Sequence, residues 1–171
     1  MNNPNFSRPH ARGAIRSFAV AFVVLALAAQ AASAATWKGL EPFVSKRADV
    51  ERVLGAPVSD QLAANGTLHF NVAGGQVTVF FVTPKFIAAK KLSPELEGTV
   101  LQIVLQHTNA TDTPESMNLV NNKDFDRQSK DQVDFFMNVK DGLGYTFVND
   151  RLKTTRYSYS TEQFARIQRG K

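Results

Sequence analysis

Alternating apolar and polar residues predict a series of short β-strands from residue 67 onward. The clearest case is 67–72, where Leu68, Phe70 and Val72 share one face and polar side chains share the other. Similar alternation occurs over 76–82, 99–107, 133–139, 143–147 and 151–159. Glycine-rich or Asn-Asp turns separate several of these stretches, which is typical of antiparallel neighbours joined by tight turns. The pattern predicts an antiparallel sheet of about six strands.

A different spacing predicts three short helices. Val50, Val53 and Leu54 form an apolar stripe at i, i+3 and i+4, with Ser45 as the predicted N-cap and Gly55 as the predicted end. Two further helices are expected after the capping signals Thr83-Pro84 and Ser160-Thr-Glu-Gln163. Because tight turns join the strands and no long crossover is present, we expect an α+β fold with the helices packed on one face of the sheet.

The apolar positions of these elements predict one shared core. Its expected members are Val50, Val53, Leu54, Phe70, Val79, Phe81, Leu101, Ile103, Phe135 and Phe147. Val133, Phe135, Met137 and Val139 are expected to line the inner face of their strand.

Residues 35–171 are expected to form a single α+β domain. A polar connection, 108–132, separates the halves 35–107 and 133–171, and three strands are expected in each half. This arrangement suggests a diverged tandem of two three-stranded units, although few residues match between them.

Residues 1–34 have the organisation of a secretory signal peptide. Three arginines precede twelve uncharged, mostly apolar residues from Phe18 to Ala29, and Ala32-Ser33-Ala34 supplies a cleavage pattern. The alternative is an uncleaved anchor, but twelve residues are short against the roughly 20 that span a bilayer. We therefore expect a periplasmic or secreted protein with no transmembrane span after the leader is removed.

Charge and cysteine content exclude several classes of function. The leader holds three of the 20 basic residues and none of the 15 acidic ones, so the remaining 137 residues carry 17 basic and 15 acidic side chains, a net charge of +2. A chain this near neutrality has no electrostatic footprint for nucleic acid. The absence of cysteine excludes disulfides, thiol catalysis, thiolate metal sites and a lipid anchor on an N-terminal cysteine.

No catalytic residue, cofactor or metal site is predicted from the sequence. Neither a G-x-S-x-G nucleophile motif nor a phosphate-binding glycine loop is present. His69 lies on a polar strand face. His107 could converge with Asp112 in a loop, but a structural role is favoured for both histidines. We therefore expect a protein that is not an enzyme.

The candidate partner-binding surface lies near the C-terminus. Tyr157 and Tyr159 are spaced to share one face of a strand and are flanked by Arg151, Lys153 and Arg156. Tyrosines beside arginines suit contact with a sugar or a peptide. The alternative is that the two rings pack on the last helix.

The segment from Ser45 to Pro57, S-x-R-x-D-V-E-x-x-L-G-x-P before a β-hairpin, resembles the start of the SmpA/OmlA (BamE-like) domain. The wider layout, from Trp37-Lys38-Gly39-Leu40 through 98–103 to a closing hairpin over 142–159, is similar to uncharacterised secreted bacterial proteins. These resemblances imply a small envelope protein in which a short helix packs against an antiparallel sheet.

The expected function is therefore a non-enzymatic binding or structural role in the cell envelope, with an envelope protein or a cell-wall component as partner. The alternative is an inhibitor-like binder of another secreted protein, because paired BamE-like units also occur in a β-lactamase inhibitor.

Cleavage of the leader provides the first test. Because the basic, apolar and small-residue regions occur in the order that signal peptidase requires, the exported protein should begin at Ala35. Intact-mass spectrometry of the exported protein measures this directly. A mass that includes residues 1–34 would contradict the prediction.

Overall fold

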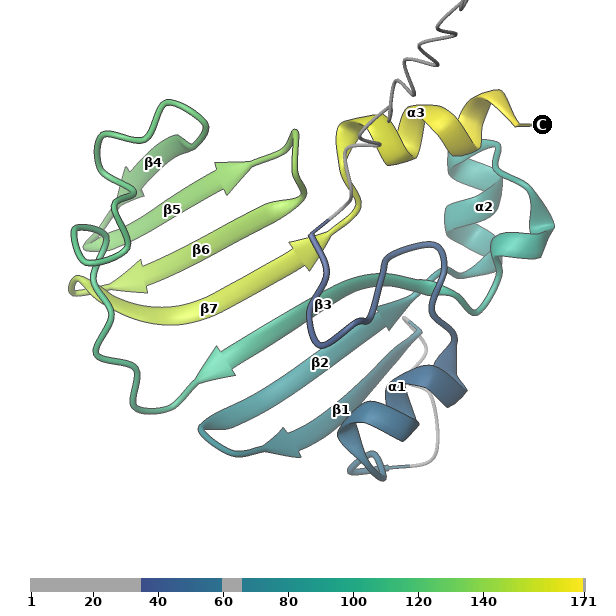
Figure 1. Cartoon of the computed structure of the whole chain (residues 1–171), viewed down its shortest axis with the longest axis horizontal. Helices are drawn as coiled ribbons and strands as arrows, with labels where there is room; N and C mark the ends of the chain where they lie inside the picture. Colours follow the sequence, from purple (N-terminus) through teal and green to yellow (C-terminus); the bar gives the residue numbers. More distant parts are fainter. Residues whose placement is uncertain (1–34, 60–65, 171) are drawn as a thin grey trace, which may run out of the picture.

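The computed structural model describes residues 35–59 and 66–170, so the predicted signal peptide lies outside the described residues. One antiparallel sheet of seven strands dominates the fold, in the order β1-β2-β3-β7-β6-β5-β4 (Figure 1). The strands are β1 (Thr67–Val72), β2 (Gly75–Phe81), β3 (Val100–His107), β4 (Asp126–Lys130), β5 (Val133–Asn138), β6 (Leu143–Val148) and β7 (Arg151–Ser158). The α+β class is confirmed, but the sheet has seven strands and not about six.

The additional strand is β4, which lies within the predicted polar connection 108–132. Its five side chains, Asp-Arg-Gln-Ser-Lys, are all exposed, and it pairs with β5 at one edge of the sheet. A strand with no apolar residue carries no alternating signal, so the sequence pattern could not reveal it. The second half of the sheet therefore has four strands, and the expected match of two three-stranded units does not hold.

Helices α1 (Arg47–Leu54), α2 (Pro84–Lys90) and α3 (Thr161–Arg169), with the 3₁₀ turn η1 (Pro94–Leu96), complete the fold. The Thr83 and Ser160 hydroxyls cap α2 and α3 as predicted, accepting from the amides of Phe86 and Gln163. The cap of α1 is Lys46 and not Ser45.

Ser45 has other bonds that explain this shift. Its carbonyl accepts from the amide of Val100 at 2.7 Å, and its hydroxyl accepts from the amide of Glu41 at 2.9 Å. Because Ser45 is tied to the start of β3, α1 begins one residue later. At the N-terminal end of α1, the Asp49 carboxylate accepts a hydrogen bond of 2.9 Å from the amide of Lys46.

The inner face of β5 is the opposite of the predicted one. Phe136 is fully buried, whereas Phe135 is 40% exposed and Val139, just beyond the strand, is 61% exposed. Asp134 is also buried, and a hydrogen bond from Ser129, supported by one from Arg127, lowers the pKa of its carboxyl. Strand β5 has apolar residues on both faces, and the acid on its inner face, Asp134, is hydrogen-bonded to Ser129 and Arg127. Simple alternation therefore selected the wrong face.

The apolar side chains form three clusters and not a single core. The first lies under β1–β3 and contains Leu40, Val50, Leu68, Phe70, Val77, Val79, Phe81, Val100 and Ile103, with Val53 and Leu54 packed against it. The second lies under β5–β7 and contains Leu119, Phe136, Phe147 and Leu152. The third joins α2, α3 and the 35–46 segment through Phe43, Val82 and Leu92, with Leu101 packed against it. The predicted single core is therefore wrong.

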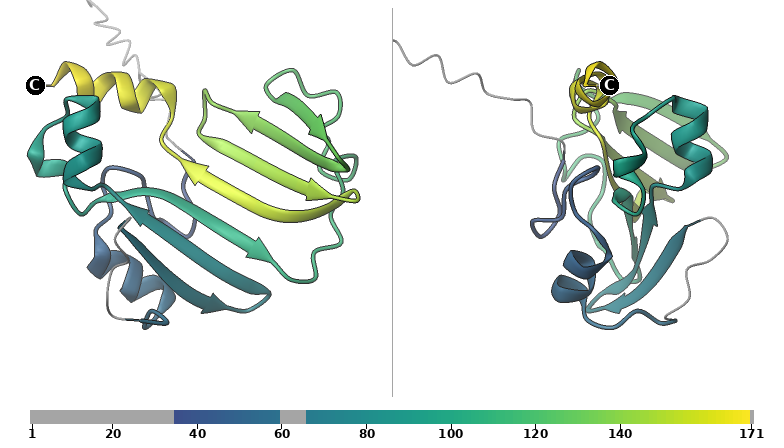
Figure 2. Two further views of the ribbon diagram at one scale, coloured as in Figure 1. Left: turned by 180° about the vertical axis from the view of Figure 1, so that it is seen from behind. Right: turned by 90° about the vertical axis from the view of Figure 1, so that its right-hand side faces the viewer.

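Two segments cover the same face of the sheet. Residues 35–46 and α1 lie over β1–β3, and the segment 108–125 packs Met117, Leu119 and Phe125 against the second cluster. Viewed edge-on, α1 and α2 lie on opposite sides of the sheet (Figure 2). The expectation that all helices share one face is therefore wrong.

The neighbouring residues Phe135 and Phe136 provide a matched stability test. Phe136→Ala should lower the free energy of unfolding by about 3–5 kcal/mol, because it leaves a cavity in the second cluster. Phe135→Ala should cost about 1 kcal/mol or less, because that ring is largely solvated. Urea unfolding followed by circular dichroism measures both. Equal losses would show that the faces of β5 have been assigned wrongly.

Candidate functional site

One face of the sheet is left uncovered by the segments that form the core. In an antiparallel ladder, paired residues lie side by side on the same face. A row of pairs crosses all seven strands: His69, Thr78, Val104, Arg156, Gly144, Met137 and Asp126. A second row crosses them beside it: Asn71, Gln76, Gln106, Thr154, Thr146, Phe135 and Gln128. These rows define the open face; of the helices in residues 35–59 and 66–170, none lies across its strands (Figure 2, left).

Arg156 lies at the centre of this face. It is exposed, pairs with Val104 on one side and Gly144 on the other, and belongs to the strand that joins the two halves of the sheet. Within residues 35–59 and 66–170, its guanidinium makes no hydrogen bond or ion pair. It therefore remains available to an anionic group from outside the chain.

Gly144 shapes the surface beside Arg156. A Cβ at this position would lie 2.7 Å from the sulfur of Met137, so the missing side chain leaves space that Met137 fills. The same Cβ would lie 3.5 Å from the Cβ of Arg156. Met137 and Arg156 therefore both border the space above this glycine, and a thioether lies beside the guanidinium stem.

A hollow of about 220 Å³ opens next to Arg156. We call it the Arg156 hollow; it is lined by Gln102, Met137, Asn138, Val139, Gly142, Leu143, Arg156, Ser158 and Tyr159. No carboxylate is among these residues. The neighbouring Asp141 accepts a hydrogen bond from the side-chain amide of Asn138 at 2.8 Å, so an amide already binds that carboxylate.

A second, more apolar hollow adjoins the first. We call it the α2 groove; it has a volume of about 340 Å³ and is lined by Phe80, Phe81, Thr83, Lys85, Phe86, Ala89 and Leu101. Phe80 pairs with Gln102, and Gln102 pairs with Ser158, so lining residues of the two hollows are neighbours along one row of the open face. One basic side chain lines each hollow, Arg156 in the first and Lys85 in the second, and among the described residues no acidic one lines either of them.

The structure separates the two tyrosines of the candidate partner-binding surface. Tyr157 lies on the covered face, where its ring stacks on Trp37 with centroids 6.5 Å apart and burial raises the pKa of its hydroxyl. Tyr159 follows the end of β7 and packs against Phe43 and Phe164, with centroids 5.0 and 5.1 Å away. Because the chain leaves the sheet at Ser158, the two-residue period no longer places Tyr159 beside Tyr157.

The three basic residues of that surface also have different surroundings. Arg156 lies on the open face, and Arg151 donates to the carbonyl of Thr111 at 2.8 Å, which ties β7 to the covering segment. Lys153 is exposed where the pairing of β6 and β7 shifts register. Of the five predicted residues, Arg156 and Tyr159 are brought together in one hollow.

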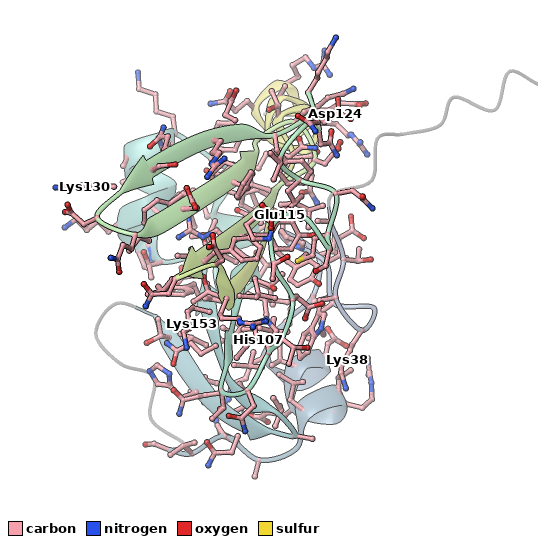
Figure 3. The ribbon with its side chains drawn as sticks, turned by 90° about the vertical axis from the view of Figure 1, so that its left-hand side faces the viewer. Lys38, His107, Glu115, Asp124, Lys130 and Lys153 are labelled. Atoms are coloured by element: carbon pink, nitrogen blue, oxygen red, sulfur yellow. The ribbon has the colours of Figure 1, made fainter. Side chains whose placement is uncertain are left out.

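His107 and Asp112, whose convergence the sequence left open, make no hydrogen bond or ion pair with each other in the described residues, although the charge of Asp112 acts on the His107 ring. Burial lowers the pKa of His107, and the charge of Asp112 partly opposes this change. The Nε2 of His107 lies 2.9 Å from the Thr155 hydroxyl, so the ring links the end of β3 to β7 (Figure 3). Among the described residues, no group of three or more His, Cys, Asp or Glu side chains is arranged to hold a metal ion.

Comparison with known proteins gives only a fold relationship. The sequence matches no protein-family model and no curated protein. The structure is similar to that of a DUF4309 family protein, YjgB, from Bacillus subtilis subsp. subtilis str. 168, with a TM-score of 0.50 and 13% sequence identity. The match covers 72% of this chain and 84% of that one, which supports a shared fold alone. None of the helices in the described residues is long and apolar enough to cross a membrane.

His107 predicts a pH dependence of stability. Because its pKa is lower in the folded chain, the unfolded chain binds the proton more tightly, and stability should fall as the pH drops below about 6.5. His107→Gln should lose less stability than the unsubstituted protein between about pH 7.5 and pH 5.5. Urea unfolding at both pH values measures this difference. An equal or larger loss in the variant would contradict the prediction.

Proposed function

We propose that this protein is exported to the periplasm or the cell exterior and is a non-enzymatic module that binds another protein through the open face. The observation that carries this proposal is a face spanning seven strands on which exposed Phe135 occupies the row next to Arg156, and Arg156 has no hydrogen-bond or ion-pair partner among the described residues. Exported location is proposed from the order of features in residues 1–34.

The composition of the open face supports protein binding. Interface centres are rich in aromatic residues, methionine and arginine and poor in other charges. Phe80, Phe135, Met137 and Arg156 have this character, whereas Asp126 and Lys130 lie on the edge strand β4. Seen from the side, Lys130 extends toward the open face and Lys38 toward the covered one (Figure 3). Asp126 and Lys130 therefore lie at the β4 edge of the face, whereas Arg156 lies at its centre with Met137 nearby.

The non-enzymatic part of the proposal rests on the ionisable groups of the face. His69 lies in a hydrogen bond with the Thr78 hydroxyl, with Nδ1 3.0 Å from Oγ1. Within the described residues, both hollows are lined without a carboxylate or a histidine. Of the described residues in the two rows, His69 and Asp126 are the groups that could transfer a proton, and they lie on the opposite edge strands β1 and β4, too far apart to act as an acid–base pair.

Loss of a defined partner upon substitution tests this proposal. Phe135→Ala combined with Val139→Ala removes exposed apolar groups and should leave the fold intact. The matched control is Lys46→Ala with Glu51→Ala at α1, away from the open face. Both variants and the unsubstituted protein are used to capture proteins from envelope extract, followed by quantitative mass spectrometry.

We expect one captured protein to fall about tenfold or more with the open-face pair and to stay constant with the α1 pair. Circular dichroism verifies that both variants are folded. A partner that is captured equally by the open-face pair, or lost with the α1 pair, would rule out the open face as the binding surface.

A further inference from the structure

We propose that the Arg156 hollow binds a carboxylate that the partner protein carries next to an apolar side chain, and that the α2 groove receives this apolar side chain. The inference rests on the proposed function, because it specifies the chemistry of the partner that the open face would bind. Three features of the open face support it: charge, hydrogen-bonding groups and the distance between the hollows.

The charge balance of the hollow favours an anion. Arg156 has no ion-pair partner within the described residues, and no acid lines the hollow. Asp141, which precedes the lining residue Gly142, accepts a hydrogen bond from the Asn138 side chain, and Asp126 lies on β4 beyond Gly144 and Met137 in the same row as Arg156. The guanidinium of Arg156 is exposed in the free protein, and a partner that covers the hollow would remove water from it and so strengthen its attraction for a carboxylate.

Further groups can complete the recognition of a carboxylate. Gln102 and Ser158 are paired across β3 and β7, and both line the hollow with Arg156. An amide and a hydroxyl can each donate to the second oxygen of a carboxylate while the guanidinium binds the first. Gly142 brings its backbone close to that of Ser158 at this end of the hollow, since a Cβ there would overlap the carbonyl oxygen of Ser158.

The apolar half of the ligand is specified by the neighbouring groove. Phe80, Phe86 and Leu101 form its apolar lining. Phe80, Gln102 and Ser158 follow one another across three strands, and neighbouring strands lie about 4.8 Å apart. The carboxylate and the apolar group should therefore be about 5–10 Å apart, a span that one or two amino-acid residues provide.

Small probes test this inference without a known partner. The probes are N-acetyl-L-phenylalanine, its primary amide and octanoate, added to isotope-labelled protein while amide NMR signals of Gln102, Gly142 and Ser158 are followed. We expect the free acid to bind at least about fivefold more tightly than the amide, because only the acid can pair with a guanidinium. The comparison between acid and amide needs no substitution, so it does not depend on the folding of a variant.

Substitutions then test whether Arg156 is the basic residue that binds the carboxylate. Arg156→Gln should lower the affinity for the acid to that of the amide, whereas Lys153→Gln should leave both affinities unchanged. Lys153 is a matched control, because it is an exposed cation on β7 that lines neither hollow. Equal binding of acid and amide by the unsubstituted protein, or an unchanged affinity in Arg156→Gln, would overturn the carboxylate site.

Two further outcomes separate this inference from the proposed function. Octanoate binding more than about tenfold tighter than N-acetyl-L-phenylalanine would indicate a lipid acid and would overturn the assignment to a protein partner. If the probes bind as expected but the Phe135 and Val139 substitutions leave partner capture unchanged, the carboxylate site holds and protein docking on the open face fails. If capture depends on the open face but the probes ignore Arg156, docking holds and the carboxylate site fails.

Discussion

The pairing of β3 with β7 is the interaction on which the rest of the structure depends. Residues 102–106 pair with 154–158, and this ladder converts two separate groups of strands into one sheet. Without it, β3 and β7 would each present a free edge, which favours pairing with other chains. His107 and Thr155 strengthen the same junction on the covered face. Arg156 lies on this joining strand, so the centre of the open face exists only when the halves are paired.

The covering of the sheet explains why one face remains free. Strands β1–β3 and β5–β7 bury apolar side chains of the first and second clusters on one face, where the segments 35–46 and 108–125, together with α1, cover them. The α3 helix is fixed to the first of these segments, because the Gln163 side chain donates to the carbonyl of Pro42 at 2.6 Å. Both halves are therefore covered from one direction, and α2 borders the open face at its end.

The sequence predicted those parts of the fold that depend on local chemistry. Thr83-Pro84 starts α2 and Ser160 starts α3, because a hydroxyl acceptor and a free amide are neighbours in the chain. The strand β1 is found with its predicted bounds, since its alternation is uninterrupted. Ser45 failed as a cap because Val100, far away in sequence, binds its carbonyl. Local patterns cannot reveal such a competing partner.

The candidate site could be predicted only in part for the same reason. Arg156 was singled out for its neighbours in sequence, and alternation gives the outward positions of β1, β2, β3 and β6 but not those of β4 and β5. Val104, Met137 and Phe80 join Arg156 only through the strand order, in which β3 pairs with β7 and β7 with β6. That order is set by tertiary packing. Tyr157 was predicted to bind a partner because tyrosine is common in binding surfaces. In the structure its ring stacks on Trp37 on the covered face.

The position of Arg156 also determines how the open face can discriminate between partners. An exposed guanidinium is hydrated in the free protein, so leaving it unpaired costs the fold little. A partner that covers the face removes this water, and a buried charge without a counter-ion is strongly unfavourable. An apolar partner surface would therefore gain from Phe135 and Met137 but lose at Arg156. A partner that supplies a carboxylate avoids this loss, so Arg156 selects against apolar surfaces that would otherwise adhere to the same face.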